Sequence, residues 1–476
     1  MSRLGLRILS SAVSVAALLA MTGAARAREP GAAGCLDPGA PLSAEESRLT
    51  VTLPAGSPGT PFAQRMIEGA GFAGFTPALV AQLCGARTLK AAEKVVTRAA
   101  GRLWTMAVDR AQRRGPVRGD LPYSDDRPLY WTRVQATAAI RQWVPAFPLF
   151  VGQRLELIEA FDRASRGMRD IALPAGDGVK RLIVSGFDPY TLDGGPGGNN
   201  IRHGNPSGAT ALSIDGTRYR AADGKVAHIE AYTLPVSFPE FRRGYLEDTV
   251  GPFMLPGPRR LDASVTVSQA GGSEFNLEQW NARYHGISLG NDRFRPCPLV
   301  GGVPQLAVNN PECNTTVVDR WGGPPTFDLR NPPQWTAATL PVQRMIDART
   351  GAGVPRPPGD TWPDESVAFG VLWRTSYTEF PDCAAPERIT RDGVPPSPQS
   401  CSYSGGGGNY LSNESAYRNT LLRDRMGLTV PAGHIHTPDM QHFETEYGVS
   451  DATFDAWRLS IAQQARNLIH VVADSA

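Results

Sequence analysis

The chain has 476 residues, of which 41% are hydrophobic and 20% are charged, a composition and length typical of a globular protein with two or three domains. Its formal net charge of +2 argues against nucleic acid as an obligate partner, because a phosphate-binding face normally needs an excess of lysine and arginine. Glycine (50) and proline (41) are both abundant, so we expect long loops between the regular elements.

Residues 1–27 are predicted to be a signal peptide. Arg3 and Arg7 give a basic start, an apolar stretch follows from residue 8 to 21, and the small residues "ARA" stand before Arg28, which is the pattern of an exported chain. The apolar stretch is too short to span a bilayer comfortably, and no later segment reaches about 18 uninterrupted apolar residues. We therefore expect a secreted protein, extracellular or periplasmic, without a membrane span.

The cysteines are predicted to form disulfides. There are six, and an even number in an exported chain favours disulfides over thiol chemistry. Six cysteines allow 15 connectivities, among which we prefer nearest-neighbour pairing. That pairing joins Cys35 to Cys84, Cys297 to Cys313 and Cys383 to Cys401. Metal binding is the competing use, but the sequence contains no CxxC pair.

Residues 28–175 are predicted to form a mainly helical accessory region. After an irregular lead-in to about residue 60, apolar residues recur at three- and four-residue spacings in 88–114, 130–144 and 154–168, which is the period of an amphipathic helix. No group of residues in this region has the pattern of a catalytic site.

Residues 176–476 are predicted to form an α/β domain with long loop insertions. Short apolar runs bounded by turn residues predict strands, and helical spacings lie between and after them. Strands that alternate with helices favour a layered α/β fold. The expected strands cover 181–187, 225–236 and 263–272, and the expected helices cover 339–350, 413–427 and 453–472. Two proline-rich, polar stretches, 286–335 and 350–403, are predicted to be loops held by the disulfides.

Ser412 is a candidate nucleophile. In "SGGGGNYLSN" a glycine run leads to Ser412 at the start of a predicted helix. Glycines let the backbone approach a ligand closely, and the N–H groups of a helix start can hold a developing oxyanion. We therefore expect backbone N–H groups between Gly408 and Ser412 to form an oxyanion hole. The alternative is a surface loop that contains a serine.

Histidines and a glutamate elsewhere could complete a triad. In "PAGHIHTPDMQHF", His434 and His436 are two residues apart and would face the same side of a strand. They are a candidate base, a surface pair or, with Asp439 and His442, a metal site, although the spacing matches no strong zinc pattern. Glu278 is the candidate acid, and a glutamate at a helix start is also a common cap.

The segment "LIVSGFDPYTLDGGPGGNNIRHGNPS" resembles the opening of the pyroglutamyl peptidase I (pyrrolidone-carboxylate peptidase) family. In that family the first strand ends in G-F-[DE]-P-[FY], and N-P-S follows. Residues 186–190 of this chain match the first element, and residues 205–207 match the second after a longer loop.

Four further motifs follow in the family's order. The segment around Glu278 is similar to the one that carries the catalytic glutamate, and "TLPVQRMIDA" resembles the family's Thr-Leu-Pro lead-in to a helix. "SGGGGNYLSN" is similar to S-x-x-[AG]-G-x-[FY]-[VL]-C-[ND], and "GHIHTP" resembles the histidine motif, with His436 in the catalytic place. The resemblance covers about residues 178–445 and does not extend to 28–175.

The resemblance implies an α/β/α sandwich with a mixed twisted sheet and the removal of an N-terminal pyroglutamyl residue from a peptide or small amide. It implies a triad of Ser412, His436 and Glu278 without a metal or organic cofactor. Phe187 and Tyr190 match the aromatic positions that hold the flat pyroglutamyl ring in the family, for which aromatic faces are suited. The amides of Asn205 and Gln269 are further candidates for hydrogen bonds to the lactam.

One difference from the family separates two hypotheses. The family's nucleophile is cysteine, whereas this chain has Ser412, and a serine hydroxyl is inert unless a base removes its proton. Either Ser412, His436 and Glu278 form a working serine triad, or the site is degenerate and only binds. Export favours the triad, because an exposed reactive thiol in an oxidising compartment would be oxidised or pair wrongly.

Overall fold

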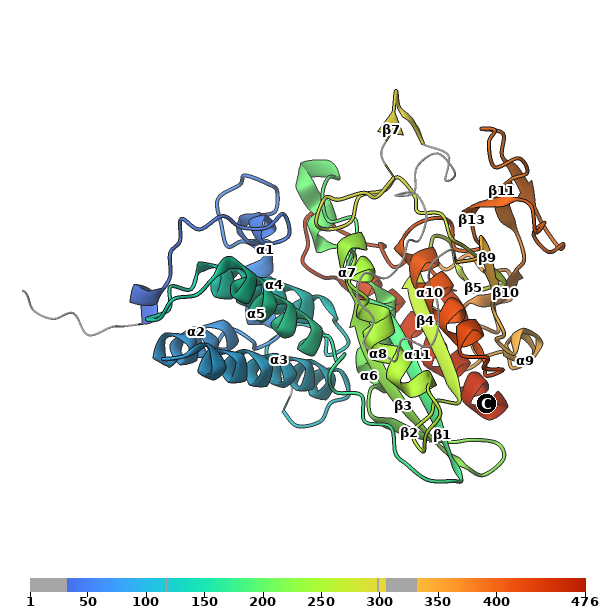
Figure 1. Cartoon of the computed structure of the whole chain (residues 1–476), viewed down its shortest axis with the longest axis horizontal. Coiled ribbons are helices and arrows are strands. Elements are labelled where there is room, and N and C mark those ends of the chain that lie inside the picture. Colours follow the sequence, from blue (N-terminus) through green and yellow to red (C-terminus); the bar gives the residue numbers. More distant parts are fainter. Residues whose placement is uncertain (1–31, 117, 298, 305–331) are drawn as a thin grey trace, which may run out of the picture.

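The computed structural model describes residues 32–116, 118–297, 299–304 and 332–476 (Figure 1). The predicted signal peptide lies outside these residues, and so does Cys313. Among the described residues, no helix is both long enough and apolar enough to cross a membrane.

Five helices form the N-terminal region and confirm the helical prediction (Figure 1). Their core contains the fully buried rings of Trp104, Trp131 and Phe161. Two short 3-10 helices precede them. The elements are η1 (Ala32–Cys35), η2 (Glu46–Thr50), α1 (Phe62–Gly69), α2 (Phe75–Gly85), α3 (Leu89–Ala111), α4 (Arg127–Gln142) and α5 (Val151–Ala164).

Two of the predicted disulfides are present. Cys35 is joined to Cys84, which ties η1 to α2. Cys383 is joined to Cys401. The predicted partner of Cys297 is outside the described residues.

A seven-stranded mixed sheet forms the centre of the second region. Its order is β10-β5-β14-β4-β1-β3-β2. The four strands β14, β4, β1 and β3 are parallel, whereas β2 runs antiparallel to β3 and β5 antiparallel to β14. The strands are β1 (Val179–Phe187), β2 (Thr217–Arg220), β3 (Val226–Leu234), β4 (Ala263–Gln269), β5 (Glu274–Glu278), β10 (Gly370–Arg374) and β14 (Ala432–Thr437).

Helices cover both faces of this sheet and complete the predicted α/β/α arrangement (Figure 1). Leu182 and Val184 of β1 belong to the core beneath α6 (Pro206–Ile214) and α11 (Ala452–Ser475). Ile183, which alternates with them, belongs to the opposite core beneath α8 and α10. The remaining helices are η3 (Pro196–Arg202), α7 (Phe238–Arg242), α8 (Tyr245–Met254), α9 (Val342–Asp347) and α10 (Leu411–Arg425).

The prediction of a loop over 350–403 is wrong at the short strands that lie in this stretch and holds between them. It contains β10, the edge strand of the main sheet, and most of a second antiparallel sheet of order β12-β11-β13. These strands are short and separated by proline-rich turns, so the sequence shows no clear two-residue period. The second sheet consists of β11 (Tyr377–Phe380), β12 (Ile389–Arg391) and β13 (Cys401–Ser404).

Short strands also lie in and beside the other predicted loop, 286–335, as far as it is described. One two-stranded sheet pairs β6 with β9, and another pairs β7 with β8. Their bounds are β6 (Trp280–Ala282), β7 (Leu299–Val300), β8 (Val303–Pro304) and β9 (Trp335–Ala337).

The carboxyl end of β1 packs directly against the start of α6. A Cβ atom added at Gly186 would lie 2.1 Å from the carbonyl oxygen of Ser207. Because that neighbour is backbone, a side chain at 186 would push the strand and the helix apart.

We expect Gly186→Ala to lower the free energy of unfolding by about 1–3 kcal/mol, since overpacking displaces well-packed backbone. Chemical denaturation followed by circular dichroism measures this. Gly257→Ala is the matched control, because its added Cβ would meet nothing within 4 Å. Equal stability of the two variants would contradict this packing.

Candidate active site

Strand β14 brings the predicted base beside the predicted acid. It lies between β4 and β5, and His434 is paired with Glu278 across the antiparallel β5–β14 ladder. His434 and His436 project from the same face, as predicted, and their ring centroids are 4.7 Å apart. Glu278 is the last residue of a strand, so its interpretation as a helix cap is wrong.

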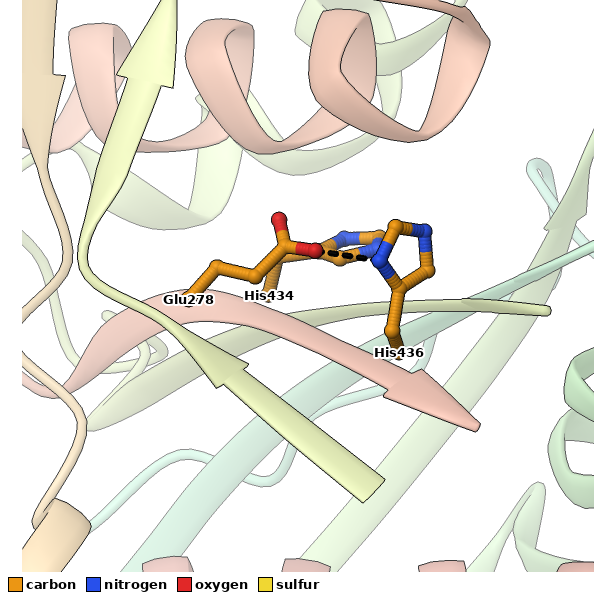
Figure 2. Close-up of side chains that lie close together, drawn as sticks. All are labelled: Glu278, His434 and His436. Carbon is orange, nitrogen blue, oxygen red and sulfur yellow. Dashed lines mark ion pairs between the residues drawn. The ribbon is translucent and has the colours of Figure 1, made fainter. Parts of the chain in front are cut away.

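Glu278 and His436 form a buried pair, in which Nδ1 of the imidazole contacts Oε1 of the carboxylate, and the pair is ionic on both sides when the imidazole is protonated (Figure 2). Burial acts to raise the pKa of Glu278, but the imidazoles of His436 and His434 hold that pKa below its ordinary value. Glu278 is therefore ionised near neutral pH. A carboxylate at Nδ1 fixes the tautomer that carries its proton there, which leaves Nε2 of His436, directed away from Glu278 in Figure 2, to accept one.

His434 is a neutral, hydrogen-bonded group. Its Nδ1 lies 2.7 Å from Oγ1 of Thr266, and its Nε2 lies 2.8 Å from Oγ of Ser268. Burial is the main cause that lowers the pKa of His434 to about 3. The ring therefore connects β14 to β4 beside the ion pair without adding a charge.

Ser412 lies in the first turn of α10, and Gly407 lies between it and the pair of Glu278 and His436. Its Oγ donates a hydrogen bond to the carbonyl oxygen of Gly407 at 3.2 Å. A Cβ added at Gly407 would lie 2.5 Å from Oε2 of Glu278 and 2.8 Å from Cε1 of His436. Gly407 therefore bridges the three predicted triad residues, and the serine hydroxyl is bonded to backbone rather than to the imidazole.

The backbone around Ser412 offers fewer free donors than predicted. The N–H of Gly408 donates to the carbonyl oxygen of Gly405 at 3.0 Å, so in this arrangement it is not directed at a ligand. The N–H of Glu414 bonds to the carbonyl oxygen of Tyr410. The N–H of Ser412 precedes that first helical bond and belongs to the group of amides that a helix start leaves without an internal partner.

Buried charges hold the start of α10 in place. Glu414, in its first turn, lies 2.8 Å from Nδ1 of His285 and also pairs with Arg418, which in turn reaches Glu247. Although burial acts to raise it, His285 and Arg418 bring the pKa of Glu414 down to about 2. These ion pairs fix the helix turn that carries Ser412.

A small pocket ends at Ser412 and contains every residue predicted for substrate binding. Its lining also includes residues that sequence reasoning missed. Ser268 directly precedes Gln269 at the end of β4 and could have been found from that position, whereas Val236 gave no signal. The pocket is lined by Phe187, Tyr190, Asn205, Val236, Ser268, Gln269, Tyr410, Leu411 and Ser412.

The two aromatic residues serve both the pocket and the core. Phe187 lines the pocket and stacks on Phe241 with ring centroids 6.2 Å apart. The hydroxyl of Tyr190 accepts a hydrogen bond from Gln269 at 3.1 Å, and burial is the main cause that raises the pKa of Tyr190 to about 12. Tyr190 is therefore a neutral phenol at the pocket wall.

The two predicted amides already have protein partners. Asn205 caps α6 by accepting from the N–H of Ser207, and its Nδ2 donates to the carbonyl oxygen of Asp188 at 3.0 Å. Nε2 of Gln269 donates to Tyr190 and to Asp439. The side-chain oxygen of Gln269 accepts one long hydrogen bond of 3.4 Å from Gln441. This oxygen is therefore better placed than Nε2 to accept a hydrogen bond from a ligand.

The candidate metal set differs from the one that spacing suggested. His442 stacks on Trp457 with ring centroids 3.7 Å apart. In the part of the chain that the structure describes, Glu278, His434 and His436 are the group whose ligand atoms are close enough to share an ion. Both ring nitrogens of His434 already contact hydroxyl groups, so an ion there would have to displace one of them.

Comparison with known proteins shows matches over nearly the whole chain. The family model "PA0049, C-terminal domain" matches residues 181–441, and "PA0049 N-terminal domain" matches residues 24–162. Protein PA0049 of Pseudomonas aeruginosa, described as uncharacterized, is 44% identical over 511 aligned residues, which cover 94% of this chain and 92% of that protein.

Two solved structures from the peptidase family that the motifs resemble are also similar. A mutant pyrrolidone carboxyl peptidase from Pyrococcus furiosus is 15% identical, with a TM-score of 0.35, and the match covers 62% of this chain and 99% of that one. Pyroglutamyl peptidase I from Bacillus amyloliquefaciens is 16% identical, with a TM-score of 0.34, and the match covers 62% and 95%.

The depressed pKa of His434 predicts a specific loss of stability in acid. The folded protein keeps this ring neutral down to a pKa of about 3, whereas the unfolded chain binds a proton near the ordinary histidine pKa of 6.5. Stability is therefore fully present above that value and falls as pH decreases. Between about pH 7.5 and pH 5, proton binding by His434 in the unfolded chain should lower the free energy of unfolding by about 2 kcal/mol.

Urea unfolding at the two pH values measures this loss in the wild type and in His434→Gln. The variant should lose less stability on acidification, even though it starts from a lower value. An identical pH dependence in both proteins would show that His434 is not a buried neutral imidazole.

Proposed function

The chain belongs to the PA0049 family, and on this premise we propose that it is a secreted hydrolase that removes an N-terminal pyroglutamyl, or closely related, residue from peptides. Ser412 is the nucleophile, His436 the general base and Glu278 the residue that orients it. The motifs that resemble pyroglutamyl peptidase I support the substrate class. Export is supported by the basic and apolar start of the chain and by its disulfides.

The observation that carries the proposal is the arrangement around Gly407. Its carbonyl accepts the hydroxyl of Ser412, while its Cα packs against the Glu278–His436 ion pair. Three residues that are far apart in the sequence therefore meet at one backbone residue. The proposed attack requires the Ser412 hydroxyl to exchange the carbonyl of Gly407 for Nε2 of His436, and such catalytic hydrogen bonds commonly form or tighten only when substrate binds.

The reaction follows from this geometry. As Oγ of Ser412 attacks the amide carbon, His436 takes the hydroxyl proton, and the first-turn N–H groups of α10 stabilise the oxyanion. When the C–N bond breaks, His436 gives that proton to the leaving amine. A water molecule then attacks the ester with its proton passing to His436, and the proton returns to Ser412 as the acid leaves. Glu278 stays ionised throughout and stabilises the imidazolium.

Ser412→Ala should reduce hydrolysis of a chromogenic pyroglutamyl amide by about 1,000-fold or more, because the nucleophile is removed. Ser412→Cys should keep measurable activity, because a thiol suits the same base. Steady-state kinetics with and without a chelator measure both variants, and the triad predicts that the chelator has no effect.

Equal activity in wild type and Ser412→Ala would remove Ser412 from the mechanism. Loss of activity with the chelator would favour a metal at Glu278, His434 and His436.

A binding protein with a degenerate site is the alternative, and the bond from Ser412 to Gly407 rather than to His436 favours it. A wild type that does not hydrolyse the amide, yet binds pyroglutamate in calorimetry, would support this alternative.

Gly407→Ala should lower kcat by about 100-fold, because the new methyl group would separate His436 from Ser412 and disturb the ion pair. Gly257→Ala is the control, since its added Cβ would meet nothing within 4 Å, whereas a Cβ at the neighbouring Gly406 would press on Glu278 itself. Thermal unfolding checks that both variants fold. Similar kcat values for the two variants would mean that contact at Gly407 does not position the triad.

A further inference from the structure

We propose that the N-terminal helical region completes the substrate pocket by holding the β1–α6 loop, residues 188–205, in shape; this role rests on the function proposed above. The loop follows Phe187 and carries Tyr190 and Asn205, all of which line the pocket. The N-terminal helices are thus a structural part of the binding site rather than an appended accessory.

Asp188 is the main point of attachment. It is buried, and its two carboxylate oxygens are taken by two arginines of the N-terminal region. Oδ1 pairs with Arg133 of α4, and Oδ2 lies 2.7 Å from Nη1 of Arg166, just after α5. Because each oxygen has its own guanidinium, the carboxylate can neither rotate nor shift without losing a charged hydrogen bond.

The two arginines are themselves held in place. Asp162 of α5 lies 3.0 Å from Nε of Arg166 and 3.5 Å from Nε of Arg133. Two aspartates and two arginines therefore form one neutral buried cluster. A buried charge that loses its partner is strongly unfavourable, so the cluster fixes Asp188 relative to α4 and α5.

Further contacts hold the rest of the loop. Arg48 pairs with Asp193 at 2.6 Å, and Asp126 accepts the N–H of Asn205 at 3.2 Å. Leu192 and Ile201 are buried in the same hydrophobic core as the N-terminal helices. The attachment therefore runs along the whole loop.

The loop needs this support because little of its own structure defines it. Four of its glycines, at 194, 195, 197 and 198, have positive φ angles, and η3 is its only regular element. Residues of this kind have many accessible backbone conformations. The positions of Tyr190 and Asn205 therefore depend on contacts from outside the loop, to which the N-terminal region contributes beside Gln269 and Asn291 of the second region. Arg133 and Arg166 do not line the pocket, so they act on substrate as positioning residues through Asp188.

The test is Asp188→Asn in the full-length protein, with Asp248→Asn as the matched control. Asp248 accepts from Arg163 at 3.1 Å and also joins the two regions, but it lies on α8 and not on the loop. Asp193→Asn is a second variant, in which the new amide oxygen can still accept a hydrogen bond from Arg48; the half-exposed side chain of Asp193 also pairs with Arg293 of the second region. The readouts are hydrogen exchange of peptides that cover 187–205 and steady-state kinetics on the pyroglutamyl amide.

Asp188→Asn should speed exchange in 187–205 about ten-fold and raise KM about ten-fold with kcat nearly unchanged, since a loosened pocket weakens binding rather than chemistry. Asp193→Asn should show the same changes to a smaller extent, and Asp248→Asn should show neither. The proposal is overturned if exchange in 187–205 is the same in all three variants and the wild type. Lack of activity in the wild type would refute the proposed function alone, because the exchange data still decide whether the N-terminal region holds the loop.

Discussion

The buried pair of Glu278 and His436 constrains the residues around it, which must compensate the charge and leave room for both side chains. A charge removed from water is tolerated only when a partner compensates it, and breaking such a pair costs about 3–5 kcal/mol. Replacing both partners by apolar residues is often neutral for stability, so a buried pair of this kind is better explained by use than by stability. Around it, residue 407 has no side chain, and His434 is kept neutral by burial while two hydroxyl groups contact its ring nitrogens.

The two regions of the chain contribute different parts of the site. The sheet carries Glu278 and His436, the proposed acid and base, on adjacent strands, and α10 carries Ser412, the proposed nucleophile, in its first turn. The pocket wall comes from a loop whose conformation depends on helices at the other end of the sequence. The contacts of Arg133 and Arg166 with Asp188 do not include Glu278 or His436, so they can change the pocket without changing that pair directly.

The choice of serine fits the redox chemistry of the rest of the chain. No free cysteine is found among the described residues, in which disulfides join Cys35 to Cys84 and Cys383 to Cys401. A thiolate at position 412 could exchange with such bonds or be oxidised. A serine hydroxyl undergoes neither reaction, and its reactivity as the proposed nucleophile depends instead on the orientation of His436.

Much of the fold could be predicted from local patterns. The three-to-four-residue period predicted α3, and the apolar runs predicted β1, β3 and β4, because both signals come from neighbours in the sequence. The common face of His434 and His436 followed from the two-residue period of a strand. The motif order that resembles pyroglutamyl peptidase I singled out Glu278, which spacing alone left as a possible cap.

Other features depended on long-range contacts that no local pattern contains. The strand character of β10 comes from pairing with β5, and the occupied N–H of Gly408 comes from a tight turn back to Gly405. The cluster of Arg133, Arg166 and Asp188 joins separate helices to a strand end. Charged residues on a helix usually face solvent, so nothing in the sequence distinguished these arginines from surface ones.

The position of β14 has a consequence for how the molecule matures. It is the last strand in the sequence, yet it lies between β4 and β5 in the interior of the sheet. Until the C-terminal segment has been synthesised and inserted, β5 has no neighbour on that side, and Glu278 has no imidazole beside it. Glu278 and His436 therefore meet only after β14 has been inserted, so the contact between them forms late in the assembly of the sheet.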